Sequence, residues 1–155
     1  MIVYNYGQIK DIPEIISLMK QHFTGDYVYT FEELKFFILN SSNCVLIATD
    51  KDTKIVVGVI MYGNKLIYCL CVDKNYQNKK IGRHLLNCII KLKINKDKNI
   101  YLHVKCLNLI ALKLYEKVGF KIIKTVKDYY TDTSPPTDAY YMKYTLNDNN
   151  NFDIY

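Results

Sequence analysis

The 155-residue sequence contains no run of about 20 apolar residues, the length that a helix needs to cross a bilayer. The segment Met1–Lys10 also lacks the charged start and apolar core of a secretory signal. Both absences argue against a spanning or exported protein. We therefore expect a cytoplasmic protein that has no membrane as its partner.

Cysteine occurs without a metal-binding pattern. The five cysteines are odd in number, and the nearest pair, Cys69 and Cys71, lies in an apolar run without the spacing of zinc ligands. Free cysteine commonly behaves as a small buried hydrophobe. The sequence therefore predicts reduced thiols and no metal site.

The pattern of apolar residues predicts one α/β domain over residues 1–146. A hydrophobic content of 50% in 155 residues suits a single core. Strands are expected near residues 2–6, 43–49, 54–62, 65–72, 100–105, 120–126 and 139–146, and helices near 12–23, 31–39, 81–90 and 109–118. The result is a mixed, mostly antiparallel sheet of about seven strands with about four helices on both faces.

Three connections carry their own predictions. Gly63-Asn64 reads as a two-residue hairpin turn, and residues 127–138 read as a polar loop. Asn108 is expected to cap the last helix and Gly119 to end it. Residues 147–155 show no periodicity and are expected to form a flexible tail.

A basic turn joins the strand ending at Val72 to the helix beginning near Ile81. Positively charged side chains normally destabilise the first turn of a helix, because the positive end of the helix dipole lies there. The free backbone N–H groups of that start can hold a pyrophosphate. The residues expected to do so are Gln77, Asn78, Lys79, Lys80, Ile81, Gly82 and Arg83. The alternative is an ordinary basic helix start. A nucleic-acid surface is not expected as the primary role, because the cations do not form a stripe.

Two motifs together resemble the GNAT acetyltransferase superfamily. Its acetyl-CoA signature, Arg/Gln-x-x-Gly-x-Gly/Ala, is matched by Gln77 and Gly82, with Lys80 in place of the first glycine. A second signature is matched by Asn108, Ala111, Tyr115 and Gly119-Phe120. The resemblance implies acetyl-CoA as cosubstrate and CoA as product. It adds Asn108, Tyr115 and the backbone of Leu70, Cys71 and Val72 to the expected cofactor-binding residues.

Within that superfamily the chain is similar to the NatE-type (San-like) N-alpha-acetyltransferases. Residues 100–104 resemble the strand that carries their catalytic histidine, here His103. Tyr129-Tyr130 resemble their substrate-clamping pair, expected in the loop before the last strand, and Phe23 and Tyr27 resemble the lining for the first substrate side chain. Leu66 stands where that family has a catalytic tyrosine. Tyr68, two residues further on the same strand face, is the expected substitute.

The residues also suggest a chemistry. An α-amine has a reference pKa of about 7.7–8.0, against about 10.4 for lysine, so one histidine suffices as its base. The run Leu66–Val72 has no carboxylate, which leaves His103. Backbone N–H groups near Leu70–Val72 are expected to bond the thioester oxygen, and Tyr115 to protonate the departing sulfur. No base is expected beside Cys69 or Cys71, which disfavours a covalent route through them or Cys106.

The function predicted from the sequence is transfer of acetyl from acetyl-CoA to protein or peptide N-termini, especially Met followed by an apolar residue. Candidate partners are an auxiliary subunit or the ribosome. Lysine or polyamine acetylation is one rival, for which Asp128, Asp132 and Asp138 are the only acids near the clamp. A catalytically silent CoA-binding or partner-binding module is the other, supported by Leu66.

Overall fold

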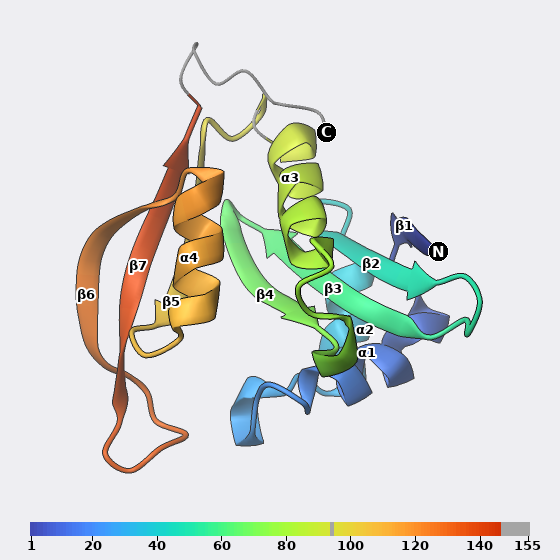
Figure 1. Cartoon of the computed structure of the whole chain (residues 1–155), viewed down its shortest axis with the longest axis horizontal. Helices are drawn as coiled ribbons and strands as arrows, with labels where there is room; N and C mark the ends of the chain where they lie inside the picture. The colour runs from blue at the N-terminus through green and yellow to red at the C-terminus, as the bar shows by residue number, and fades with distance from the viewer. Residues whose placement is uncertain (94, 147–155) are drawn as a thin grey trace.

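Seven strands form one mixed sheet in the order β1-β2-β3-β4-β5-β7-β6 (Figure 1). The computed structural model describes residues 1–93 and 95–146. The strands are β1 (Ile2–Tyr6), β2 (Cys44–Asp50), β3 (Val56–Gly63), β4 (Leu66–Val72), β5 (Asn99–Lys105), β6 (Lys121–Tyr130) and β7 (Thr137–Thr145). The α-helices are α1 (Ile12–Met19), α2 (Phe31–Leu39), α3 (Ile81–Lys93) and α4 (Leu109–Val118). Short 3-10 turns occupy Ile9–Asp11, Gly25–Tyr27 and Lys74–Tyr76.

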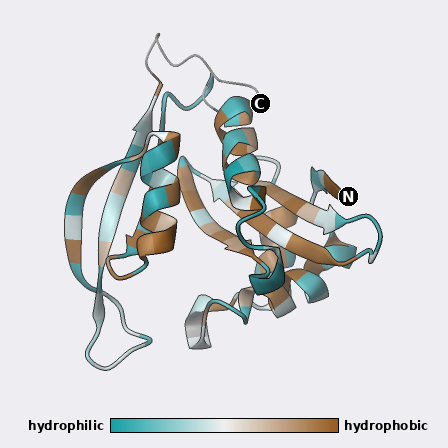
Figure 2. Ribbon diagram, in the orientation of Figure 1, coloured by the Kyte–Doolittle hydropathy of each residue, from teal (hydrophilic) through white to brown (hydrophobic). Residues whose placement is uncertain are grey.

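Helices cover both faces of the sheet, as the sequence predicts. One core joins α1 and α2 to β2, β3 and β4, with Ile15 and Val59 at its centre. The other joins α3 and α4 to the opposite face, with Leu85 and Ile60 fully buried. Gly58 lets α3 approach closely, because a Cβ there would lie 3.0 Å from Ile81 Cγ2. Figure 2 shows the apolar strands β3 and β4 between the two helical layers.

Strands β4 and β5 are the only parallel neighbours in the described sheet, and they separate after two residue pairs. Leu66 pairs with Tyr101 and Ile67 with Leu102, and the ladder ends there. On the other edge of β4, Cys69 pairs with Met61 and Ile67 with Tyr62, which leaves Tyr68 as the extra residue of a β-bulge. A bulge bends its strand. The β4 edge that faces β5 is therefore left without a strand partner beyond Ile67.

The hairpin between β3 and β4 differs from the prediction by one residue. Its turn is Asn64-Lys65, both in the left-handed region with φ of 47° and 65°, and Gly63 pairs with Leu66 inside the ladder. Two positive φ values make a type I′ turn, which suits a hairpin. Glycine is needed at position 63 for packing instead, because a Cβ there would collide with the Asn43 side chain.

The polar segment 127–138 is also shorter as a loop than predicted. Strand β6 continues to Tyr130 and β7 begins at Thr137, with irregular register between Val126 and Tyr130. The expected loop tyrosines, Tyr129 and Tyr130, thus lie at the end of a strand, where sheet pairing holds the backbone. Other element boundaries agree with the prediction within a few residues, and the predicted tail lies outside the described residues.

None of the helices traced in residues 1–93 and 95–146 combines the length and apolarity needed to cross a membrane. All five cysteines are free thiols. The same described ranges hold no group of three or more His, Cys, Asp or Glu side chains arranged to bind a metal ion.

Candidate active site

The separation of β4 from β5 opens a cavity of about 430 Å³. It brings together residues that the sequence places far apart: His103, Tyr68, Tyr115, Asn108, Leu70, Phe23, Tyr27, Tyr129 and Tyr130. These are the predicted catalytic residues, part of the predicted cofactor set and the whole predicted substrate set. They share one cavity because the sheet diverges above Ile67.

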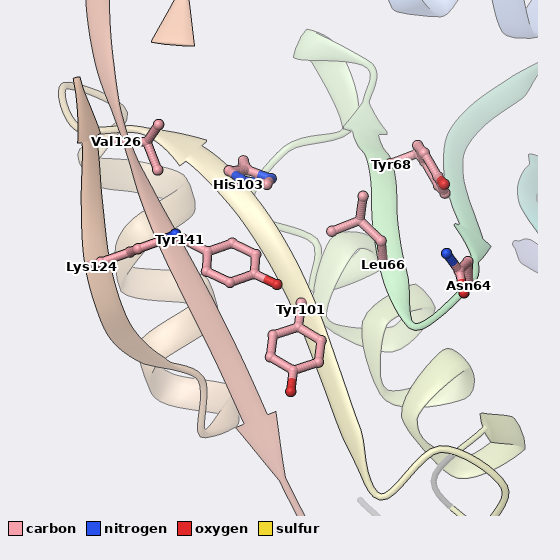
Figure 3. Close-up of a pocket in the computed structure, with 8 residues that line it drawn as sticks. All are labelled: Asn64, Leu66, Tyr68, Tyr101, His103, Lys124, Val126 and Tyr141. Atoms are coloured by element: carbon pink, nitrogen blue, oxygen red, sulfur yellow. The ribbon is translucent and has the colours of Figure 1, made fainter. Parts of the chain in front are cut away.

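A second cavity of about 410 Å³ adjoins the first and shares Leu66, Tyr68 and His103 with it (Figure 3). Its other lining residues are Asn64, Tyr101, Lys124, Val126 and Tyr141. His103 therefore stands in the wall between two spaces. No local sequence pattern predicts the smaller cavity, because its lining comes from four strands and a hairpin turn.

His103 is held between two aromatic rings. Its ring stacks on Tyr129 with centroids 4.4 Å apart and planes at 8°, and it lies 4.7 Å from the ring of Tyr141. Burial lowers the pKa of His103, and the nearby Lys124 ammonium lowers it further. Both causes favour the neutral imidazole, which is the form that can accept a proton.

Asn108 precedes α4 and Tyr115 lies on it, and both side chains line the larger cavity. The side chain of Asn108 caps the helix by accepting a bond of 3.1 Å from the Ala111 amide, and Gly119 ends the helix at φ 118°, both as predicted. Burial raises the pKa of Tyr115. The phenol therefore stays protonated, which suits hydrogen-bond donation better than complete transfer of its proton to a thiolate.

The predicted substrate residues form a bonded cluster. Tyr27 Oη accepts a bond of 3.0 Å from the Thr131 amide, and its ring lies 5.6 Å from that of Tyr130. Tyr129 meets Tyr130 edge to face with centroids 4.9 Å apart. This cluster connects the segment after α1 to the end of β6. Phe23 lies four residues beyond the end of α1, and its amide donates to the Met19 carbonyl.

Leu66 and Tyr68 both line the two cavities, in agreement with their predicted common face. The Tyr68 ring packs edge-on against Phe37 of α2 with centroids 5.4 Å apart. In Figure 3 it points away from His103, whereas Leu66 points into the space beside Tyr101 and Tyr141. A catalytic role for Tyr68 stays a prediction, and in this arrangement it requires a change of side-chain direction.

The basic turn before α3 lies outside both cavities, and two of its residues have positive φ angles. Asn78 and Lys80 both adopt φ of 62°, the left-handed conformation usually reserved for glycine. Lys80 therefore holds a backbone conformation that glycine adopts without a steric penalty from a Cβ atom.

Gly82 is the second residue of α3, whose first turn contains no acidic residue. A Cβ at this position would meet Leu114 and Val72 at 3.5 Å, an ordinary contact distance, so packing does not require glycine here. Of the cations, Lys79 lies over the Tyr76 ring at 4.5 Å. Binding of a pyrophosphate by this turn stays a prediction.

Several cavity residues escaped the sequence analysis. His22, to which the sequence assigned no role, lines the larger cavity and donates from Nε2 to the Val72 carbonyl at 2.8 Å. Tyr29 and Lys105 also line it. Lys105 pairs with Asp132 at 2.6 Å, and the second carboxylate oxygen of Asp132 is buried without a partner. Only proximity across the sheet reveals these residues.

The thiols near the site are poorly suited to nucleophilic catalysis. Cys69 and Cys71 have their sulfurs 3.4 Å apart, and this contact, followed by burial, raises the pKa of Cys71. Burial also raises the pKa of Cys106. A raised pKa reduces the thiolate fraction, so these two side chains lack the activated form that attack requires.

A family model described as acetyltransferase (GNAT) domain matches residues 4–131. An N-alpha-acetyltransferase of Saccharolobus solfataricus is 30% identical over 152 residues, which cover 88% of each chain. N-alpha-acetyltransferase 50 of Danio rerio is 39% identical over 74 residues, 46% of this chain and 43% of that protein. An uncharacterized Mycobacterium leprae protein is 30% identical, and the match spans only 38% of its length.

Among solved structures, Arabidopsis thaliana NAA60 in complex with a bisubstrate analogue superposes with a TM-score of 0.83 at 17% identity. The match covers 95% of this chain and 99% of that one. At this identity the likeness concerns the fold.

Proposed function

The chain belongs to the acetyltransferase (GNAT) domain family, whose model matches residues 4–131, and from this premise we propose that it is an N-alpha-acetyltransferase. The observation that carries the proposal is the single cavity that Asn108 and Tyr115 line together with Tyr27, Tyr129 and Tyr130, with His103 also in its wall. Acetyl-CoA would lie beside Asn108 and Tyr115, and a peptide N-terminus beside the three tyrosines. The Saccharolobus and Danio relatives named for this activity support the choice.

Acetyl-CoA supplies an acetyl group already activated as a thioester, so the chain has mainly to position and to move protons. His103 is the proposed base, because its lowered pKa keeps the imidazole neutral at the pH at which an α-amine must lose its proton. The unpaired edge of β4 near Leu70 offers backbone N–H groups to the thioester oxygen. Tyr115 donates a hydrogen bond to the leaving sulfur.

The placement of carboxylates favours an N-terminal amine over a polyamine. The residues that line the larger cavity include no Asp or Glu among those the structure describes. Asp132 is engaged by Lys105, and Asp138 accepts from the Asp128 amide. A polyamine carries several positive charges, so its binding would require carboxylates in the site that are not already paired with other residues. An aromatic wall of Phe23, Tyr27 and Tyr29 suits an apolar first residue such as Met.

A silent CoA-binding module is the second candidate, and one observation supports it. Leu66 points into the space beside His103 where the resemblance calls for a tyrosine, and Tyr68 is directed elsewhere (Figure 3). Under that reading the chain binds CoA without turnover. We also propose a cytoplasmic location, with which the free thiols agree. An auxiliary subunit or the ribosome is the proposed partner.

A peptide panel tests the proposal. The protein is incubated with acetyl-CoA and with peptides that begin Met-Leu or Ala-Leu, with N-blocked lysine peptides and with spermidine, and products are identified by mass spectrometry. We expect acetylation of the α-amine of the Met-Leu peptide. Acetylation confined to blocked lysines or spermidine would replace the substrate assignment, and binding of CoA without any product would establish the silent module.

A further inference from the structure

His103 belongs to a row of directly paired residues that crosses three strands. Its pairing partner on β7 is Tyr141, and the partner of Tyr141 on β6 is Lys124. Direct cross-strand partners carry their side chains on the same face of a sheet. All three line the smaller cavity, and Figure 3 shows the Lys124 side chain extending from β6 toward Tyr141.

One aromatic ring separates the Lys124 charge from the imidazole. Lys124 Nζ lies 5.6 Å from the centroid of the Tyr141 ring, and that ring lies 4.7 Å from the ring of His103. A second positive charge on His103 would therefore form close to the ammonium in a partly buried wall. Coulomb repulsion at such separations disfavours the imidazolium.

None of the described residues that line the two cavities is an Asp or Glu that could neutralise this charge. Tyr129 on β6 and Tyr141 on β7 present aromatic faces, which attract a cation and so act against Lys124. On β5, the strand of His103, the charge of Lys105 is paired with Asp132. Lys143 Nζ lies 6.0 Å from the centroid of the Tyr101 ring. The remaining titratable groups that line the two cavities are His22, Tyr27, Tyr29, Tyr68, Cys69, Tyr115 and Tyr130.

No carboxylate of the described residues forms an ion pair with Lys124, whose side chain is exposed. Apart from its contact with the Tyr141 ring, its charge is balanced by solvent, and it acts on the His103 imidazole on the other side of that ring. We propose that Lys124 is a positioning residue for proton transfer, which keeps the His103 ring unprotonated and able to accept the proton of the attacking amine. The catalytic consequence rests on the proposed function, whereas the electrostatic relation between the two side chains does not.

The test compares Lys124→Met, which keeps an apolar stem and removes the charge, with Lys124→Arg, which restores the charge. Lys121→Met is the matched control, because Lys121 lies on the same strand, is exposed and lines neither cavity. Ring resonances of His103, assigned with a His103→Gln variant, are titrated by NMR in the free protein. Acetylation of the Met-Leu peptide is followed across the same pH range, and thermal melting verifies folding.

We expect His103 of Lys124→Met to protonate at a higher pH than in the wild type, and kcat/KM to fall roughly threefold on the acidic side with no change at alkaline pH. Lys124→Arg and Lys121→Met should behave as the wild type. An unchanged His103 titration in Lys124→Met overturns the inference, as does an equal shift in Lys121→Met. A shifted titration in a protein that acetylates no substrate supports the electrostatic relation and overturns the proposed function.

Discussion

The Tyr27 hydroxyl accepts a hydrogen bond of 3.0 Å from the Thr131 amide, although the two residues are 104 positions apart. This bond ties the segment after α1 to the connection between β6 and β7. Tyr27, Tyr129 and Tyr130 all line the larger cavity, so the bond helps to hold its proposed peptide side in shape.

Tyr27→Phe tests this connection, because it keeps the ring and removes the acceptor. A net contribution of about 1 kcal/mol for one hydrogen bond predicts a rise of roughly fivefold in the KM for peptide. CoA affinity, measured by calorimetry, should stay at the wild-type value. Tyr6→Phe on β1, where the side chain is exposed, is the control. An equal loss of CoA affinity would mean that the bond supports the whole site.

The pH dependence of kcat/KM should show two steps as the pH falls. One step, near the α-amine reference pKa of about 7.7–8.0, belongs to the peptide. The second step belongs to His103 and lies below the histidine reference pKa of about 6.5. Burial and the Lys124 charge lower the pKa of His103 in the folded protein. The base is thus active above that step and lost as the pH falls through it.

His103→Gln should lower kcat by roughly 10²-fold or more, the usual contribution of a general base, while CoA affinity is kept. In its residual activity the second pH step should be absent and the peptide step retained. His84→Gln is the control, since His84 stacks on Tyr4 at 3.9 Å, away from both cavities. Wild-type turnover in His103→Gln would remove this residue as the base.

Tyr115→Phe should lower kcat about tenfold, because the leaving sulfur loses one hydrogen-bond donor. Burial raises the pKa of Tyr115, so the wild type should show no loss of activity from its ionisation up to about pH 10. Stopped-flow release of CoA, followed with a thiol reagent, measures the step directly. An unchanged rate of CoA release would assign Tyr115 to packing alone.

Lys80→Gly should stabilise the protein by about 0.5–1 kcal/mol, since glycine adopts the left-handed conformation that Lys80 holds at φ 62° without a Cβ penalty. Lys80→Ala keeps the Cβ and removes the charge, so it should bring no such gain. Urea unfolding measures both. If the Lys80 charge contacts a CoA phosphate, the two variants should lose the same CoA affinity, and this loss should diminish with salt.

Much of the fold follows from local patterns. The periodic apolar residues of α3, the cap at Asn108 and the stop at Gly119 need only their own neighbours, and the structure has all three. The prediction that Gly63 is a turn residue is wrong because it too rested on sequence neighbours alone. Its nearness to Asn64 suggested a turn residue, whereas the absence of a Cβ serves the approach of Asn43, which no local pattern records.

The candidate site divides in the same way. The turn predicted to bind the pyrophosphate and the segment of Asn108 and Tyr115 are each contiguous in sequence, and motif resemblance predicted both roles. The sequence did not predict that Tyr129 lies near the end of strand β6 and stacks on His103, nor that Lys124 belongs to the row of His103 and Tyr141. These relations depend on which strands become neighbours.

The sequence by itself determined the alternation of strands and helices, the single core and the residue types that carry the chemistry, because periodicity, capping and turn preferences act over a few residues. The tertiary structure alone decided where β4 and β5 part. The bulge at Tyr68 bends β4, the ladder ends after Ile67, and the cavity opens between the two strands. Its walls come from distant segments, since sheet pairing and core packing act between residues that the chain holds far apart.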